Sequence, residues 1–382
     1  MTEVPDTGSV WCVVAGGGTA GHVLPGLAVC EALVTRGHGR DSLHVIGSTR
    51  GAETTLVPAA GIGLTTLPGR GLNDRRVNLA NLLAAWGIVR GVVAGVGAVR
   101  RLRPSVVLAL GGYAAVPGVV GAMIWRVPVV VSEQNARASL ANRLAGRVAR
   151  ACAVPSAATD LPRAVVTGNP VRPAIVAASV LAADPERRSA LRDRLGVAPD
   201  RSLVLVQSGS LGARSVNRAT IEMVELLARR GDLHVHHVVG RRDWGTEHAP
   251  APRLGDDAAI HYESVEYEEH TDDLMSAADL FIGRAGASTV AELAVIGLGS
   301  ILVPLPIAPR DAQRANAQLL VDVGGAVVVD DGALGGASLA ALVVDLVADP
   351  ERLTEMSRAA RSIGRPDAAD AVAALCEEHA RV

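Results

Sequence analysis

Lysine is absent from this sequence of 382 residues, and aromatic side chains are scarce. All 37 residues counted as Lys or Arg are therefore arginines, which excludes a phosphate-binding loop of the form G-x-x-x-x-G-K-[ST]. With one Phe, three Tyr and four Trp, the interior has to be filled by Val, Leu, Ile and Ala. Apolar runs such as Val106 to Leu110 are typical of buried strands, so the composition favours a parallel α/β protein.

Cysteine is also rare. The four cysteines lie far apart in apolar segments and include no C-x-x-C pair, so we expect reduced core thiols and neither a disulfide framework nor a zinc site. Residues 1–9 contain Glu3 and Asp6 and lack the basic-then-apolar order of a signal peptide, which predicts a cytoplasmic protein.

One long stretch carries no charge. Ser105 to Trp125 contains 21 uncharged residues and passes a crude length test for a transmembrane helix. Gly111, Gly112 and Pro117 interrupt this stretch, so we predict a strand, a loop and a buried helix there.

Charge is distributed unevenly along the chain. Residues 1–165 contain 16 Arg and 8 acidic residues, a net charge of +8, whereas the remainder contains 21 Arg and 31 acidic residues, a net charge of −10. The basic half suits contact with anionic lipid headgroups or phosphate, and a solvated basic surface is an equally open interpretation.

The length of the chain predicts two domains. Apolar runs alternate with helical segments in both halves, which indicates right-handed βαβ units on parallel sheets. We therefore expect an α/β protein with two doubly wound, Rossmann-like domains facing across a cleft, with ligands at the carboxyl ends of the strands. The expected domains are residues 1–168 and 169–366. The final helix, at residues 367–382, is able to cross back and pack on the first domain, and the sequence alone leaves this open. The predicted strands are 10–15, 43–46, 106–110 and 129–132 in the first half, and 203–207, 234–239, 280–282 and 301–303 in the second.

A glycine-rich loop follows the first predicted strand. Gly16-Gly17-Gly18 leads through Thr19-Ala20-Gly21 into His22 and an apolar helix. Glycines in this position let backbone N–H groups approach a phosphate at a helix N-terminus, although a tight turn without a ligand has the same pattern. An imidazole at the mouth of such a loop is a candidate general base, and a capping or core histidine is the alternative.

Three further clusters follow strands of the second half. Ser208 to Ser215 repeats the order of strand, Gly/Ser loop and helix and predicts a second anion site. Gly283 to Glu292 ends with a carboxylate able to accept two ribose hydroxyls, or simply to stabilise a helix N-terminus. Gln313 and Asn316 open another helix, where amides bind sugar hydroxyls or face solvent.

Seven loops together resemble, in order and spacing, the motifs of the MurG family of lipid II-forming N-acetylglucosaminyltransferases. The resemblance spans about residues 10–330. Its motifs are Gly17–His22, Gly111-Gly112-Tyr113, Glu133-Gln134-Asn135, Thr167–Arg172, Ser210–Ala213, Arg284–Ala287, and Gln313 with Asn316.

This resemblance implies a GT-B fold and an inverting transfer of N-acetylglucosamine from UDP-N-acetylglucosamine to lipid I. The acceptor is the 4-hydroxyl of the muramoyl residue of undecaprenyl-pyrophosphoryl-MurNAc-pentapeptide, and the product is lipid II of peptidoglycan synthesis. It further implies a peripheral protein at the cytoplasmic face of the cell membrane, an anionic membrane surface as a partner, and other cell-wall synthesis proteins as possible partners. We expect no cofactor and no nucleic acid.

The resemblance also assigns roles to individual residues. The expected base is His22, with Glu133 as the second candidate. The resemblance implies that UDP-N-acetylglucosamine is bound by Thr19, Ala20, Gly21, Asn135, Arg172, Ser210, Glu268, Ala287, Ser288, Thr289, Glu292 and Gln313. It implies that the acceptor is bound by Gly17, Gly18, Gly111, Gly112 and Tyr113.

The chain departs from the family pattern at four positions. Leu211 replaces a glutamine of the second glycine loop, and Ser132 replaces a histidine before Glu133. Arg314 follows Gln313 where two glutamines are common, and Glu268 is unusually acidic for the uracil position.

The leaving diphosphate is expected to meet Arg172 and the helix N-terminus behind Ser210. No D-x-D motif occurs in the sequence, so we expect no essential divalent ion in the transfer.

The segment from Arg75 to Arg103 mixes arginines with apolar residues. Such a segment is able to lie in a lipid headgroup region, and a helix packed on its own sheet is the alternative.

Other functions are open from sequence alone. They are a GT-B glycosyltransferase for another lipid or soluble acceptor, a related UDP-sugar epimerase, and a non-catalytic scaffold that retains the fold.

Overall fold

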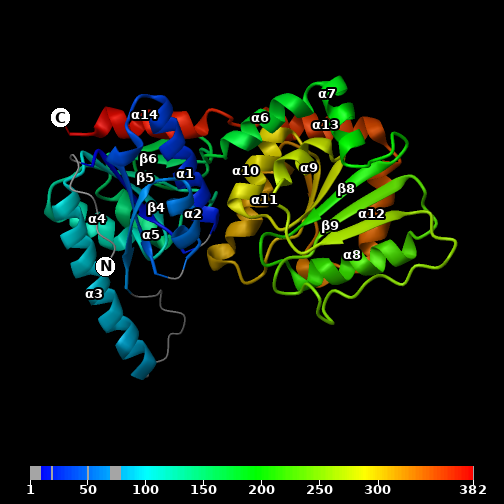
Figure 1. Ribbon diagram of the computed structural model, residues 1–382, viewed down its shortest axis with the longest axis horizontal. Helices are drawn as coiled ribbons and strands as arrows, with labels where there is room; N and C mark the ends of the chain where they lie inside the picture. The colour runs from blue at the N-terminus through cyan, green and yellow to red at the C-terminus, as the bar shows by residue number, and fades with distance from the viewer. Residues whose placement is uncertain (1–9, 19, 50, 69–78, 382) are drawn as a thin grey trace. The chain divides into compact units, whose positions relative to one another are not determined.

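The computed structural model describes residues 10–18, 20–49, 51–68 and 79–381, and the chain divides into two compact units (Figure 1). Unit 1 comprises Met1–Arg172 and Arg365–Val382, and unit 2 comprises Pro173–Gly364. Each unit has its own parallel sheet, and each is described separately below.

Unit 1 is built on a seven-stranded parallel sheet in the order β3-β2-β1-β4-β5-β6-β7. Its strands are β1 (Cys12–Gly16), β2 (Leu43–Ser48), β3 (Gly63–Leu67), β4 (Val106–Gly111), β5 (Val129–Ser132), β6 (Ala151–Val154) and β7 (Ala164–Val166). Its helices are α1 (Ala20–Thr35), α2 (Glu53–Ala59), α3 (Leu79–Leu102), α4 (Ala115–Ile124), α5 (Leu140–Gly146) and α14 (Ala368–His379), with a 3-10 turn η1 (Arg40–Ser42).

Both faces of this sheet are buried at its inner strands, β2, β1, β4, β5 and β6, because these strands are apolar at successive positions. Val13 and Ala15 of β1 face α3, α4 and α5, whereas Cys12 and Val14 face α1, α2 and the C-terminal helix α14. The last helix of the chain is therefore part of the core of unit 1.

Unit 2 is built on a six-stranded parallel sheet in the order β10-β9-β8-β11-β12-β13. The helices α8 and α12 cover one face of it. Its strands are β8 (Ser202–Gln207), β9 (Leu233–Val238), β10 (His261–Val265), β11 (Leu280–Gly283), β12 (Ser300–Leu302) and β13 (Ala326–Val328). Its helices are α6 (Pro173–Ala182), α7 (Pro185–Arg194), α8 (Arg214–Leu226), α9 (Thr271–Ala277), α10 (Ala287–Ile296), α11 (Ala312–Val321), α12 (Gly336–Val347) and α13 (Pro350–Ser362), with 3-10 turns η2 (Pro309–Asp311) and η3 (Asp331–Ala333).

The α/β prediction is confirmed, and the ends of all eight predicted strands lie within two residues of the observed ones. The uncharged stretch from residue 105 to 125 forms β4 and α4, as expected. Within the described ranges, no helix combines the length and the apolar character needed to span a membrane.

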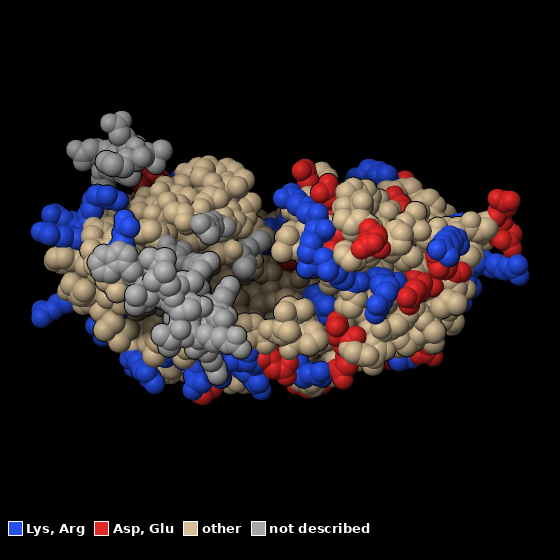
Figure 2. Space-filling model, turned by 90° about the horizontal axis from the view of Figure 1, so that it is seen from below, with Lys and Arg blue, Asp and Glu red and all other residues tan. Residues whose placement is uncertain are grey.

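The two units differ in surface charge. On the face drawn in Figure 2, unit 1 shows arginines with few acidic side chains, whereas unit 2 shows both signs side by side. This difference agrees with the net charges of the two halves of the sequence.

Candidate functional site

In unit 1, the loops after β1 and β4 meet at the carboxyl ends of their strands. A Cβ atom added to Gly112 would lie 2.9 Å from the carbonyl oxygen of Gly17, and the φ angle of Gly112 is +73°. Gly111 also has a positive φ of +94° and lies beside Asn142 of α5. These close approaches explain why glycines are needed where the sequence predicts acceptor contacts.

A buried carboxylate that the sequence analysis missed supports the first glycine loop. Glu53, at the start of α2, accepts hydrogen bonds from the backbone N–H of Gly18 at 2.9 and 3.1 Å. It also accepts from the N–H and hydroxyl of Ser48 at 2.6 and 2.8 Å. A Cβ atom on Gly17 would lie 2.3 Å from the Glu53 carboxylate, so only glycine fits above it. Burial raises the pKa of Glu53, but these hydrogen bonds outweigh it and hold the pKa below the ordinary value of 4.5.

His22 lies half-buried in the first turns of α1, next to this loop. Burial lowers the pKa of His22 from its ordinary value of 6.5, and the charges of Glu133 and Glu53 oppose only part of that shift. A neutral imidazole at physiological pH is able to accept a proton, as a general base must.

Glu133, the second candidate base, follows β5 and is only 1% exposed. Its carboxylate accepts hydrogen bonds from the backbone and side chain of Asn135 at 2.9 and 3.2 Å. It also accepts from the backbone N–H of Ser139 at 2.8 Å and the side chain of Asn142 at 2.9 Å. Four donors occupy the carboxylate, which therefore orders this loop and the start of α5.

The other predicted residues of unit 1 lie around these loops. Ala20 and Gly21 open α1, and Thr19 lies outside the described residues. The hydroxyl of Tyr113 donates to the carbonyl of Pro68 at 3.1 Å. Arg172 is the last residue of unit 1 before α6 and is half-buried.

In unit 2, the glycine loop after β8 packs tightly against the loop after β9. A Cβ atom on Gly212 would lie 1.9 Å from the carbonyl oxygen of Val239. The backbone N–H of Arg241 donates to the carbonyl of Ser210 at 3.1 Å, and Ser210 is exposed. Helix α8 then begins at Arg214 without a side-chain cap at Ala213.

Helix α10 also begins without a side-chain cap, after Gly286. Ala287, Ser288 and Thr289 form its first turn, and the buried Ser288 hydroxyl has no hydrogen-bond partner among the described residues. Glu292 follows within the helix and is half-buried. Uncapped N–H groups at two neighbouring helix starts, after the adjacent strands β8 and β11, are suited to an anion.

A partly buried ion pair fixes these helix starts, and the sequence analysis missed its acidic member. Arg284 lies 2.7 Å from Asp331, and both bond the hydroxyl of Ser215, at 2.9 and 2.6 Å. Arg284 also donates to the carbonyl of Val303 at 3.0 Å. Burial raises the pKa of Asp331, but the hydrogen bonds from Ser215 and Arg284 outweigh it and lower that pKa overall.

Gln313 and Asn316 hold the loops after β12 and β11. The side-chain oxygen of Gln313 accepts from the backbone N–H of Leu305 at 2.9 Å, and the buried Asn316 donates to the carbonyl of Ala285 at 3.2 Å. Gln313 is half-buried and so presents its side chain at the edge where these loops meet.

Glu268, predicted at the uracil position, lies in the loop after β10. Its carboxylate accepts from the backbone N–H of His270 at 2.7 Å, and its carbonyl accepts from the hydroxyl of Thr271 at 3.2 Å. The loop is thus closed by its own hydrogen bonds.

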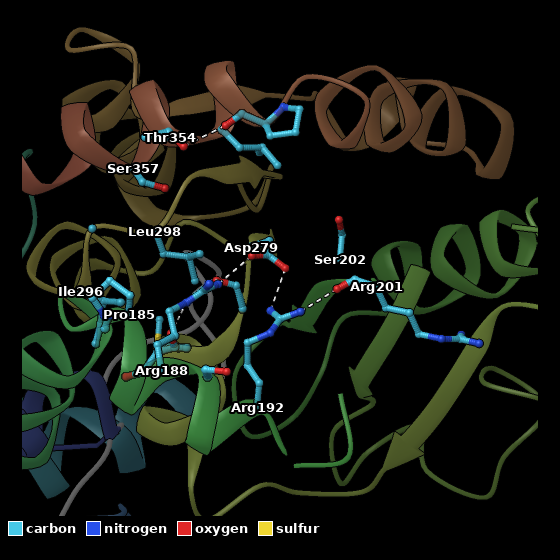
Figure 3. Close-up of a pocket in the computed structure, with 18 of the residues that line it drawn as sticks. Pro185, Arg188, Arg192, Arg201, Ser202, Asp279, Ile296, Leu298, Thr354 and Ser357 are labelled. Carbon is cyan, nitrogen blue, oxygen red and sulfur yellow. Dashed lines mark hydrogen bonds and ion pairs between the residues drawn. The ribbon is translucent and has the colours of Figure 1, made fainter. Parts of the chain in front are cut away.

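A separate cavity of 780 Å³ lies at the opposite end of unit 2's sheet, where β8 and β11 begin (Figure 3). Arg188 and Arg192 point into it, and both bond Asp279, at 2.6 and 2.9 Å. Both arginines also donate to the carbonyl of Ala277. Since these two charges are paired with Asp279, Arg188 and Arg192 stabilise the fold of unit 2.

Comparison with known proteins identifies the family. Residues 12–154 match the glycosyltransferase family 28 N-terminal domain, and residues 203–372 match the glycosyltransferase family 28 C-terminal domain.

Curated relatives cover nearly the whole chain. The UDP-N-acetylglucosamine–N-acetylmuramyl-(pentapeptide) pyrophosphoryl-undecaprenol N-acetylglucosamine transferase of Acidothermus cellulolyticus is 39% identical over 373 residues, 96% of this chain and 97% of the relative. The same enzyme of Moorella thermoacetica is 39% identical over 368 residues, 94% of this chain and 96% of the relative.

Solved structures agree with this relationship. The crystal structure of Acinetobacter baumannii MurG has a TM-score of 0.73 and 28% identity, and the match covers 96% of this chain and 99% of that one. A UDP-N-acetylglucosamine 2-epimerase structure from Listeria monocytogenes has a TM-score of 0.68 at 16% identity over 98% of this chain and 97% of that one, a likeness of fold alone. The sequence-based prediction of the family is confirmed: the chain belongs to glycosyltransferase family 28 and, within it, to the MurG N-acetylglucosaminyltransferases with a GT-B fold.

Proposed function

We propose that this chain transfers N-acetylglucosamine from UDP-N-acetylglucosamine to the 4-hydroxyl of the muramoyl residue of undecaprenyl-pyrophosphoryl-MurNAc-pentapeptide. The observation that carries this proposal is the similarity, at 39% identity over 96% of the chain, to a relative named for that transfer. The glycine loops and uncapped helix starts supply binding groups for the two diphosphate-containing substrates.

Unit 1 supplies the groups that bind the lipid-linked acceptor and the residue that acts as general base. His22 is kept neutral by burial and takes the proton of the attacking hydroxyl while the bond to UDP breaks on the opposite face of the anomeric carbon. Glu133 positions Asn135 and the start of α5, because its four hydrogen bonds leave its carboxylate no place for a substrate proton. Gly17, Gly18 and the loop of Gly112 give the acceptor access to backbone groups.

Unit 2 supplies the donor groups. The N–H groups at the starts of α8 and α10, with Ser210, Ser288 and Thr289, bind the diphosphate and stabilise the charge that develops on UDP as it leaves. Arg172, at the junction of the units, adds a positive charge to the same group.

Three residues select the rest of the donor, two through their side chains and one through its backbone. Glu292 accepts the ribose hydroxyls, because a carboxylate offers only acceptors and the two hydroxyls offer donors. The Gln313 amide, anchored through its oxygen to Leu305, offers its NH₂ group to the hydroxyls of the sugar. The backbone at Glu268 lies next to uracil.

A membrane surface is part of the same proposal. Exposed apolar side chains line α3 and α4 of unit 1, with arginines beside them, including Arg100, whose guanidinium lies 5.2 Å from the ring centre of Trp125. We call this set the α3–α4 surface. Its apolar members are Val89, Val93, Val116, Met123, Ile124 and Trp125. Such a mixture suits insertion among anionic headgroups at the cytoplasmic face, and Arg75 and Arg76 of the predicted segment lie outside the described residues.

The transfer is tested with purified protein in EDTA, with lipid I and a set of UDP-hexoses. We expect transfer from UDP-N-acetylglucosamine to lipid I with inversion, and little transfer to soluble sugars. Equal use of soluble acceptors, or conversion of the donor to its 2-epimer without an acceptor, would contradict the proposal.

The base is tested with His22→Gln, which retains a polar side chain without the basic nitrogen. We expect kcat to fall about 10²- to 10⁴-fold with a much smaller change in KM, because the base acts in the chemical step. His248→Gln in unit 2 is the matched control and should keep the wild-type rate. A normal kcat for His22→Gln would remove this residue from the role.

The membrane contact is tested with Val93→Glu, since this side chain is 68% exposed. Binding to phosphatidylglycerol vesicles should weaken, while Val180→Glu, at a 61% exposed valine of α6 in unit 2, should bind as wild type. Equal weakening by both variants would show that charge alone, and not the α3–α4 surface, governs binding.

A further inference from the structure

Two neighbouring parallel strands of unit 2 carry metal-ligating side chains on one face. In β9 and the edge strand β10, His234 lies opposite His261 and His236 lies opposite Glu263. Because side chains alternate between faces with a period of two, these four side chains share a face. From the sequence alone, His234, His236 and His237 lie on one predicted strand and are expected to pair with solvent and core, not to bind metal. The sequence does not show which strand lies beside them.

Three of these side chains converge. One donor atom from each of His234, His261 and Glu263 lies within 4.8 Å of the other two. His234 Nε2 is 2.9 Å from Glu263 Oε1, and the rings of His234 and His261 are 4.1 Å apart between centroids. A tetrahedral ion with bonds of about 2.0–2.1 Å needs donor atoms about 3.3 Å apart, so only small side-chain movements separate this cluster from a coordination site.

A fourth side chain orients the cluster. His236 Nδ1 is 2.8 Å from Glu263 Oε1, the same oxygen that His234 contacts, and His236 is buried, so it restrains the position of this oxygen. Histidine and carboxylate partners of this kind commonly fix metal ligands in place. His237 points to the other face, where it bonds Tyr262 and Asn217, and it takes no part in the cluster.

The cluster is buried on one side, at His234, and exposed to solvent on the other, at His261 and Glu263. His234 is 1% exposed, and its Nδ1 atom has no hydrogen-bond partner among the described residues. His261 is exposed, and the side chain of Glu263 is 42% exposed, so an ion is able to enter from solvent. Solvent then supplies a water as the fourth ligand.

We propose that His234, His261 and Glu263 bind one divalent transition-metal ion of the zinc class, with His236 as a positioning residue. Two imidazoles and one carboxylate suit Zn²⁺ or Co²⁺, whereas Mg²⁺ and Ca²⁺ prefer sites made of oxygen. The ion takes the place of the hydrogen between His234 Nε2 and Glu263 Oε1, and the neutral imidazole then carries its one hydrogen on Nδ1. The bound ion joins the edge strand β10 to β9, so it stabilises unit 2 and takes no part in the proposed transfer.

The test measures binding to the untagged full chain after removal of metal with EDTA and dialysis. Zn²⁺ is titrated in competition with a chromophoric chelator, and Co²⁺ is added separately to record visible absorption. We expect one Zn²⁺ per chain, a Co²⁺ spectrum of tetrahedral intensity, and a rise of about 5 °C or more in the unfolding midpoint at saturating Zn²⁺.

Variants assign the ligands. His261→Ala and Glu263→Gln should each lose the stoichiometric site, and His236→Ala should weaken Zn²⁺ binding about 10- to 100-fold. His248→Ala, at a histidine outside the cluster, is the control and should bind as wild type. Because His261 is exposed, His261→Ala should unfold at the wild-type temperature in EDTA. Loss of Zn²⁺ binding in this variant would then reflect loss of the ligand and not loss of the fold, and Glu263→Gln provides a second, independent variant.

The absence of stoichiometric Zn²⁺ binding by the wild-type chain would overturn the proposal, as would unchanged binding by both His261→Ala and Glu263→Gln. Since the measurement reports metal binding and stability, its failure would leave the proposed transfer untouched.

Discussion

Replacing Glu53 by Gln keeps the size of a side chain that is wholly buried but removes the charge beneath the first glycine loop. The carboxylate accepts from Gly18 N–H and from the N–H and hydroxyl of Ser48. In either orientation, the amide of Gln turns an NH₂ group toward one of these donors, so at least one charge-assisted hydrogen bond is lost. Such bonds contribute about 1.5–3 kcal/mol each, and we expect the free energy of unfolding to fall by about 2 kcal/mol.

The same change has a second, separable effect on the pH dependence of transfer. The negative charge of Glu53 raises the pKa of His22, so its removal should lower that pKa further. A base is active when deprotonated, and activity is lost as the pH falls through its pKa. The acidic limb of the kcat/KM profile should therefore move to lower pH in Glu53→Gln, while the maximal rate falls because the glycine loop is displaced.

The assays are urea unfolding and transfer kinetics between pH 5 and 8. Glu31→Gln is the matched control, because Glu31 pairs with Arg40 at a partly exposed site of unit 1. Its variant should lose less than about 1 kcal/mol and keep the wild-type pH profile. A limb that stays in place or moves to higher pH in Glu53→Gln would refute the electrostatic link between this carboxylate and His22. Stability within about 0.5 kcal/mol of wild type would refute its role in the loop.

Two further predictions concern single residues. Gly212→Ala would bring a Cβ atom to 1.9 Å from the Val239 oxygen, so its binding of UDP-N-acetylglucosamine should weaken at least 10-fold. The control Gly209→Ala has a similar φ of +75° but open space around it, so it should cost only about 1–2 kcal/mol of stability. Equal binding of the donor by both variants would contradict the packing argument. Burial lowers the pKa of His44 to about 4, so the unfolded state gains a proton before the native state does as the pH falls below 6.5. His44 should therefore contribute a loss of stability of up to about 3 kcal/mol between pH 6.5 and 4, and His44→Gln should lose this contribution in urea unfolding while that of the buried His237 remains. An unchanged slope in His44→Gln would show that other groups cause the pH dependence.

The fold was largely predictable because buried parallel strands leave long apolar runs. Val106–Gly111 and Ser202–Gln207 are of this kind, and both were located within about one residue. The strand β7 gave no such signal, because it has three residues whose side chains are exposed at the edge of the sheet. Edge strands bury few side chains, so their composition resembles that of loops.

The candidate site was predictable only in part. Glycine loops after strands are visible in the sequence because close backbone approach requires glycine, as at Gly112 and Gly212. The groups that hold these loops were not visible. Glu53 acts on Gly18 from 35 positions away, and Asp331 acts on Ser215 from 116 positions away. Nothing in the local sequence distinguishes such an acid from a solvated one.

The position of α14 sets the order in which the chain is able to fold during synthesis. Arg36 of unit 1 binds both Asp370 and Glu377 of this helix, and Val372 and Cys376 complete the core against β1 and β4. Every residue of unit 2 leaves the ribosome before α14 does, so unit 2 is able to complete its core first. A nascent chain therefore keeps one apolar face of unit 1's sheet partly uncovered until α14 has been synthesised, and premature termination just before residue 365 would yield an intact unit 2 joined to an incomplete partner.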